Sequence, residues 1–167
     1  MYEDMGQYGW IVEKCAEFIK SWLTKFSGIN ALMTRYRNEA RRFRAVRDFL
    51  GRMRRIPEVK SVHFWIRESG LRKAGNHPIQ SGAQGIMKEA MGLLVPLLEQ
   101  IRAAGYYIRV LLQIHDSLLF EMDDEILYWT IPMIRVIMEN AITLSIPTPV
   151  DFKVGKRWGS MEKWEVK

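Results

Sequence analysis

The chain has 167 residues, of which 48% are hydrophobic and 26% charged, and this balance excludes a disordered protein and fits one folded domain with a core of its own. No apolar run reaches the roughly 18 residues of a membrane-spanning helix, and the first residues lack the basic start and apolar middle of a signal peptide. The single cysteine, Cys15, excludes an internal disulfide. We therefore expect a cytoplasmic protein with no membrane partner.

Positive charge is concentrated in one segment. Residues 35–73 hold thirteen lysine or arginine side chains and four acidic ones, a net charge of +9, whereas the whole chain carries +6 and the remainder therefore −3. Eleven of the thirteen are arginines, whose planar fork suits phosphates and base edges. The segment favours a surface for a polyanion, with a solvated helix face as the alternative.

Two amphipathic helices are predicted first. Apolar residues recur every three or four positions over Val12–Phe26, and Ser27–Gly28 should end that helix. Cys15 lies among the apolar positions and is expected to be a small core residue. An arginine-rich helix follows over Ala31–Ala45. Phe49–Pro57 then predicts a turn and a basic strand or loop, and Gly70–Pro78 predicts irregular backbone.

A largely buried helix is predicted over residues 84–104, kinked or divided at Pro96. Two apolar runs within Tyr107–Met122 flank the polar residues 115–117, which is typical of a buried β-hairpin with a polar tip. A further helix is predicted to begin near Asp123, with a break or a fresh first turn at Pro132. An extended segment and a short strand over Val150–Val154 follow. The order predicts an α+β fold with one antiparallel sheet.

Asp116 lies at the expected tip of the hairpin. A carboxylate there is fixed by the sheet and open on one side, which suits a metal ligand. An aspartate also closes turns without any further function, so the pattern alone leaves both interpretations open.

Three stretches, in this order, resemble the C-terminal part of the family A DNA polymerases. Residues 51–57, GRMRRIP, resemble the family's G-R-R-x-x-L-P segment. Residues 76–91 resemble N-x-P-[IM]-Q-G-[ST]-A-A-D-I-[IM]-K-x-A-M. Residues 112–121, LQIHDSLLFE, resemble motif C, L-Q-V-H-D-E-L-[VL]-F-E. The likeness extends over about residues 12–158 and favours the metal-ligand interpretation of Asp116.

The resemblance implies template-directed nucleotidyl transfer, in which two Mg²⁺ ions assist attack of a primer 3′-hydroxyl on a dNTP. It makes Asp116 one of the two carboxylates that bridge these ions and places His115 at the primer terminus. It also assigns primer–template DNA contacts to a group of polar and basic residues: Arg52, Arg54, Arg55, Arg72, Asn76 and Gln80. Residues 1–75 would then be the end of the fingers with a basic connection, and residues 76–167 the motif C half of the palm.

The chain departs from the family pattern at a few positions. Ser117 replaces the second acid of motif C, so metal binding is expected to be weaker. Gly85 replaces an aspartate and Gln84 an alanine near the predicted helix start.

Two elements of the family are absent from the sequence. None of the six aspartates lies in the D-x-S-x-[IL]-E context of motif A, and the R-x₃-K-x₆-YG pattern of motif B does not occur. We therefore expect a larger N-terminal chain to supply the second bridging aspartate and the nucleotide-binding helix, as in a split, phage-like polymerase working in a bacterial or phage-infected cell. The alternatives are a non-catalytic duplex DNA-binding protein derived from a palm, and a piece cut from a longer polymerase.

Overall fold

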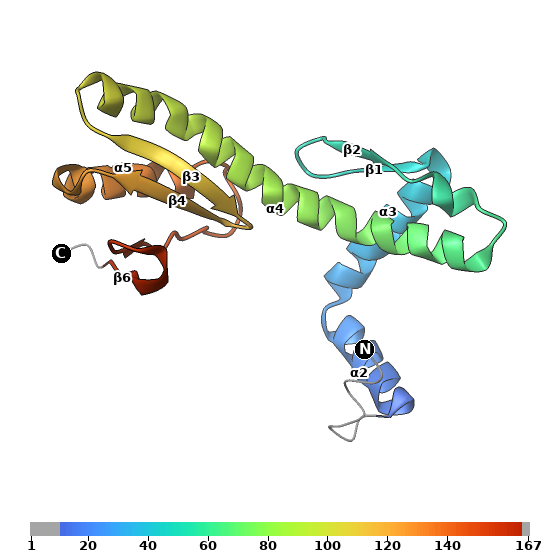
Figure 1. Cartoon of the computed structure of the whole chain (residues 1–167). Helices are drawn as coiled ribbons and strands as arrows, with labels where there is room; N and C mark the ends of the chain where they lie inside the picture. Colours follow the sequence, from blue (N-terminus) through green and yellow to red (C-terminus); the bar gives the residue numbers. More distant parts are fainter. Residues whose placement is uncertain (1–10, 165–167) are drawn as a thin grey trace. The chain divides into compact units, whose positions relative to one another are not determined.

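The computed structural model describes residues 11–164, and the chain divides into two compact units, residues 1–80 and 81–167 (Figure 1). The N-terminal unit contains α2 (Val12–Lys25), α3 (Ser27–Phe43), β1 (Ala45–Arg47), β2 (Met53–Arg55) and η1 (Pro57–Lys60). The C-terminal unit contains β3 (Ile108–Ile114), β4 (Ser117–Met122), η2 (Asp124–Ile126), α5 (Leu127–Glu139), β5 (Lys153–Val154), η3 (Trp158–Ser160) and β6 (Glu162–Lys163). The helix α4 (Phe64–Ala103) contributes residues to both units.

The core of the N-terminal unit joins α3, the β1–β2 hairpin, η1 and the first part of α4. The helix α3 ends where Arg44 adopts a left-handed conformation, with φ 54°, and its backbone N–H donates to the Ala40 carbonyl at 2.8 Å. The chain then turns into β1 and pairs with β2 in an antiparallel register. The buried cluster that results consists of Tyr36, Ala40, Val46, Ile56, Val59, Leu71 and Ala74.

The helix α2 confirms the predicted amphipathic helix but not its expected burial. None of its residues, all of which the structure describes, is buried, and Cys15 is half-buried rather than a core residue. The helix α2 ends at Lys25, just before the predicted stop at Ser27 and Gly28, but these two residues form the first turn of α3 rather than a longer break. The periodic apolar face of α2 is therefore largely exposed in the described part of the chain.

The prediction of irregular backbone over Gly70–Pro78 is wrong, because α4 runs without interruption from Phe64 to Ala103. Gly70 and Gly75 permit close packing rather than a turn. A Cβ on Gly70 would lie 3.0 Å from the Glu58 Cβ and from the Val59 backbone nitrogen, and one on Gly75 would lie 2.5 Å from Met33 Cε. Pro96 does not divide the helix either.

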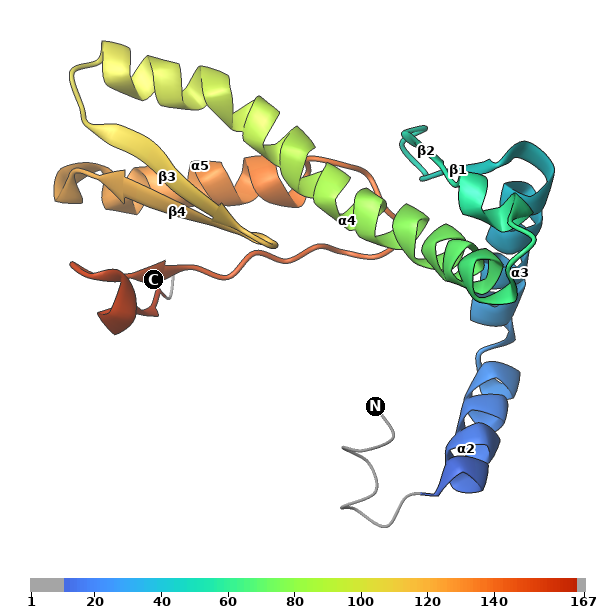
Figure 2. The same ribbon diagram turned by 45° about the vertical axis from the view of Figure 1, so that its right-hand side comes forward.

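The predicted hairpin forms the centre of the C-terminal unit. In both views β3 and β4 lie beside the last turns of α4 and beside α5 (Figures 1 and 2). One face of the hairpin packs on the core that these helices share, whereas Leu111 and Leu112 are 47% and 46% exposed, so the hairpin is half-covered rather than buried. The core cluster contains Leu94, Leu97, Leu98, Ile101, Ile108, Ile126 and Ile134.

The α+β class is confirmed, but the described residues form three two-stranded antiparallel sheets, β1–β2, β3–β4 and β5–β6, instead of one. The predicted break at Pro132 is also wrong, since Pro132 lies inside α5. The strand predicted over Val150–Val154 shortens to β5, which pairs with β6. No helix within residues 11–164 is long and apolar enough to cross a membrane.

Candidate nucleic-acid interface and metal ligand

A polar hollow of about 280 Å³ lies on the N-terminal unit, between β2 and one face of α4. Its residues on α4 follow the spacing of a single helix face, three or four positions apart. The lining residues are Arg54, Ser69, Arg72, Lys73, Asn76, His77 and Gln80. The structure thus brings together four of the predicted DNA contacts, Arg54, Arg72, Asn76 and Gln80.

The lining of the hollow carries three cationic side chains and no acidic one. Arg54, Arg72, Asn76 and Gln80 are exposed, so their polar groups can reach a ligand. Because the hollow is open and positively charged, its chemistry suits an anionic or hydrogen-bonding polymer such as nucleic acid.

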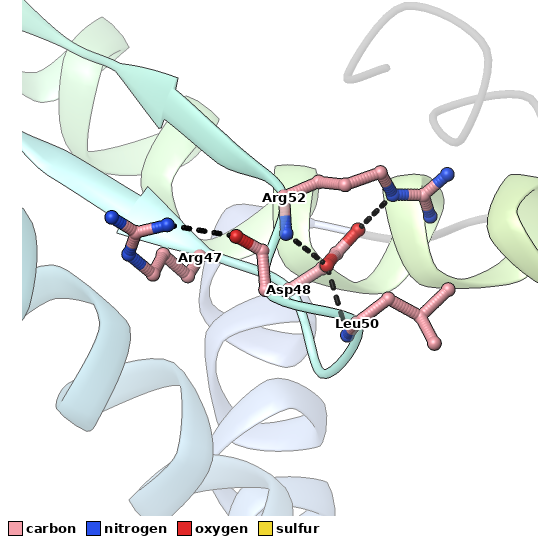
Figure 3. Close-up of polar contacts among 5 residues, drawn as sticks. Arg47, Asp48, Leu50 and Arg52 are labelled. Carbon is pink, nitrogen blue, oxygen red and sulfur yellow. Dashed lines mark hydrogen bonds and ion pairs between the residues drawn. The ribbon is translucent and has the colours of Figure 1, made fainter.

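Arg52 and Arg55 do not line the hollow. Successive side chains of a strand point to opposite faces, so Arg55 is exposed on the face opposite to Arg54. Arg52 Nε instead donates to Asp48 Oδ2 at 2.9 Å (Figure 3).

Asp48 organises the turn between β1 and β2. Its side chain is fully buried, and Oδ1 accepts the backbone N–H groups of Leu50 at 3.0 Å and Arg52 at 2.9 Å (Figure 3). Gly51 adopts φ +82° within this turn, and the Arg47 guanidinium donates to its carbonyl at 2.8 Å. A buried carboxylate held by three donors fixes the backbone that leads into the basic strand.

Two titratable groups at or beside the hollow, Glu58 and His77, have pKa values shifted from their ordinary values. Lys73 Nζ donates to Glu58 Oε1 at 2.7 Å, and this hydrogen bond lowers the pKa of Glu58 from its ordinary value of 4.5. Burial, followed by the positive charge of Arg54, lowers the pKa of His77 from 6.5. The His77 Nε2 atom is buried and has no hydrogen-bond partner among the described residues.

In the C-terminal unit, His115 and Asp116 form the two-residue loop between β3 and β4. His115 has φ 54°, whereas the φ of Asp116 is not positive. A positive φ at the first loop residue alone is typical of a type II′ turn. Gln113 Nε2 donates to the His115 carbonyl at 3.0 Å, and Ser117 Oγ donates to the Ile114 carbonyl at 2.9 Å. These bonds fix the loop and leave the Asp116 carboxylate exposed.

The described residues alone do not fit a two-ion centre. No group of three or more His, Cys, Asp or Glu side chains within residues 11–164 could hold a metal ion. Asp116 offers one hard oxygen ligand, of the kind that Mg²⁺ prefers, and Ser117 uses its hydroxyl within the turn. Within the described residues, Asp116 therefore offers a single exposed carboxylate at the tip of the hairpin.

A larger hollow of about 410 Å³ lies in the C-terminal unit, and its lining falls within residues 139–149. The only acidic or basic side chain of that lining is Glu139, whose Oε1 accepts the Val150 backbone N–H at 2.9 Å. Because its one charge holds the loop, we assign this hollow a structural role.

Sequence reasoning missed Ser69, Lys73 and His77. Each lies three or four residues from a predicted contact on α4, so helical periodicity was the signal that could have identified them. This periodicity was overlooked because irregular backbone was expected at Gly70–Pro78.

Comparison with known proteins agrees with this arrangement. Residues 6–160 match the family described as DNA polymerase family A. The chain is 34% identical over 146 residues to DNA polymerase I of Geobacillus stearothermophilus, an alignment that covers 87% of the chain and 16% of that relative. It is 31% identical over 151 residues to the thermostable DNA polymerase I of Thermus aquaticus, covering 90% and 18%. The chain thus spans less than a fifth of these relatives.

A solved structure is similar as well. It is the POL domain of Pol1 from M. smegmatis in complex with DNA primer-template and dNTP, with a TM-score of 0.76 and 31% sequence identity. The match covers 86% of this chain and 25% of that chain.

Proposed function

The chain belongs to DNA polymerase family A, and we propose that it forms the part of a template-directed DNA polymerase that carries one metal-binding carboxylate and part of the surface for primer–template DNA. The observation that carries this proposal is the position of Asp116, exposed at the tip of a two-residue hairpin loop within the LQIHDSLLFE stretch. His115, its neighbour in the loop, would contact the primer terminus.

The DNA contact is supported by the hollow of the N-terminal unit. Asn76 and Gln80 can donate hydrogen bonds to minor-groove acceptors, which all base pairs share, so the contact would be indifferent to sequence. Arg54 and Arg72 line the same hollow and would bind the backbone or the groove edge. Arg52 and Arg55 would add positive charge beside the hollow.

Asp116 would hold Mg²⁺ together with an aspartate from another polypeptide segment. Such ions would supply positive charge for the attacking and leaving oxygens of nucleotidyl transfer. The role of this chain is to fix one carboxylate on a rigid hairpin and to orient the primer end beside it.

We propose that a larger chain with motifs A and B supplies the missing aspartate and the dNTP-binding helix, as in a split, phage-like polymerase in the bacterial cytoplasm. One structural feature supports a partner. The helix α2 has no buried residue in the described part of the chain, and it exposes Phe18 at 58%, Ile19 at 57% and Trp22 at 40%. A contiguous apolar face of this kind is typical of a protein–protein interface.

In family terms, we propose that about the first 75 residues correspond to the end of the fingers and the remainder to the motif C half of the palm. The structural division falls nearby, between Gln80 and Ser81.

The experiment is to capture the chain from its source, measure the native mass and identify its companions. We expect a complex larger than 19.6 kDa that contains a second chain with a D-x-S-x-[IL]-E segment and extends a primer. A lone 19.6 kDa protein that binds duplex DNA would overturn the proposal.

One observation favours a second candidate, a non-catalytic duplex-binding protein: no group of three or more His, Cys, Asp or Glu side chains among the described residues could hold a metal ion. Such a protein would bind duplex DNA without a partner, with steep salt dependence. Replacing Asp116 with alanine would not weaken that binding, whereas it would abolish primer extension by a polymerase complex.

A further inference from the structure

The hollow of the N-terminal unit contains a histidine, His77, whose surroundings are not explained by the positive charge of the hollow alone. His77 lines it, yet its Nε2 atom is buried without a hydrogen-bond partner among the described residues. Buried polar atoms in proteins are nearly always paired, so an unpaired one requires an explanation, and beside a cationic hollow a hydrogen-bonding anion is one.

We propose that the hollow binds one backbone phosphodiester of nucleic acid and that His77 is a proton-linked ligand of it, so that binding takes up a proton. The proposal rests on the proposed DNA contact and goes beyond it, because it names the bound group and makes the contact depend on pH.

The geometry supports a phosphodiester. Arg54, Arg72 and Lys73 supply three cationic groups around the hollow, and Ser69 and Asn76 supply neutral donors. An open hollow with this charge suits one singly charged group of a polymer.

The charges around His77 set the direction of the proton linkage. The positive charges of Arg54 and Arg52 disfavour an imidazolium, and Asp48 favours it. Arg72 and Lys73 on α4 also line the hollow, with Lys73 offset by Glu58. A phosphodiester between these groups would add a negative charge, which favours the imidazolium and supplies an acceptor for a ring N–H. Binding should therefore strengthen as the pH falls.

The family pattern assigns no role to His77, which occupies the unspecified position of N-x-P. The proposed proton linkage therefore goes beyond the contacts that the resemblance implies.

The test measures duplex binding by the full chain between pH 7.5 and 5.5 at constant ionic strength, using fluorescence anisotropy. One linked proton allows at most about a tenfold change per pH unit, and we expect the affinity to rise about three- to tenfold over the range. His77→Gln should remove this rise, and the matched control His63→Gln, which changes an exposed histidine, should retain it. An equal rise in His77→Gln would overturn the proposal.

A second measurement uses the unaltered protein and does not depend on the stability of a variant. The His77 pKa is followed by NMR of the ring with no ligand, with micromolar duplex and with millimolar inorganic phosphate. We expect the duplex to raise it. If the duplex binds and this pKa does not move, the inference fails while the proposed DNA contact stands. If only inorganic phosphate raises it, the site takes free anions and the nucleic-acid assignment fails. If the duplex does not bind at any pH, both proposals fail.

Discussion

The two units fix their candidate functional side chains by different means. In the N-terminal unit, carboxylates restrain one cation of the hollow and one beside it: Glu58 holds Lys73 at 2.7 Å and Asp48 holds Arg52 at 2.9 Å. At the hairpin tip of the C-terminal unit, the described hydrogen bonds go to backbone carbonyls, from Gln113 and Ser117. The ion pairs of the N-terminal unit partly neutralise its positive charge, which suits the binding of an anion. The hydrogen bonds of the hairpin loop fix the position of one exposed carboxylate, which suits a metal ligand.

The largest expected effect separates catalysis from binding. Asp116→Asn removes the carboxylate charge at the tip and should reduce primer extension by the complex at least about a thousandfold, or roughly 4 kcal/mol in the barrier. Duplex affinity should stay within about twofold, because the hollow is unchanged. Single-turnover extension and anisotropy measure the two, and Asp151→Asn, at an exposed aspartate of the same unit, is the control. Undiminished primer extension by Asp116→Asn would show that Asp116 is not part of the catalytic site.

The second effect compares a buried ion pair with an exposed one. Asp48→Ala deletes a buried carboxylate with three donors and should lower the free energy of unfolding by about 2–4 kcal/mol. Asp124→Ala removes only the exposed pair with Lys156 and should change little that can be measured. Urea unfolding followed by circular dichroism compares them. Equal effects would mean that the turn does not depend on Asp48.

The third effect compares two glycines of α4. Gly70→Ala places a methyl group 3.0 Å from the Val59 backbone nitrogen and should destabilise by about 1–3 kcal/mol. Gly92→Ala meets no described atom within 4 Å and should stabilise by about 0.5–1 kcal/mol through helix propensity. Urea unfolding again measures the two changes. A stable Gly70→Ala variant would show that α4 does not pack closely on η1.

The smallest effect is a pH dependence of stability. Because Lys73 lowers the pKa of Glu58, their interaction stabilises the fold above pH 4.5 and is lost as the pH falls through the lowered folded value. The difference in urea midpoint between the wild type and Glu58→Gln should therefore be present at pH 6 and shrink below pH 4.5. A difference that persists at pH 3 would assign the effect of Glu58 to something other than its charge.

The hairpin could be predicted because its signal is local. Two apolar runs around three polar residues specify two strands and a tip, and the structure has the loop at His115 and Asp116. The expected burial was wrong for the outer face, because apolar composition does not say which side of a two-stranded sheet a helix covers.

The continuity of α4 could not be predicted, because a glycine in a turn and a glycine in a close contact look the same in sequence. Gly70 and Gly75 are explained only by η1 and by Met33, which lie far from them along the chain. For the same reason the candidate site was predicted only in part. Resemblance supplied Arg72, Asn76 and Gln80, whereas His77 and Lys73 join them only once α4 is known to be one helix.

We propose that this chain contributes one carboxylate and a DNA surface to a polymerase completed by another polypeptide segment. The most direct measurement is primer extension in Mg²⁺ by the purified 167-residue chain, alone and mixed with the companion captured from its source. We predict no extension by the chain alone and extension by the mixture that requires Asp116. Primer extension by the chain alone would overturn this proposal. So would a lack of primer extension in every complex that contains the chain.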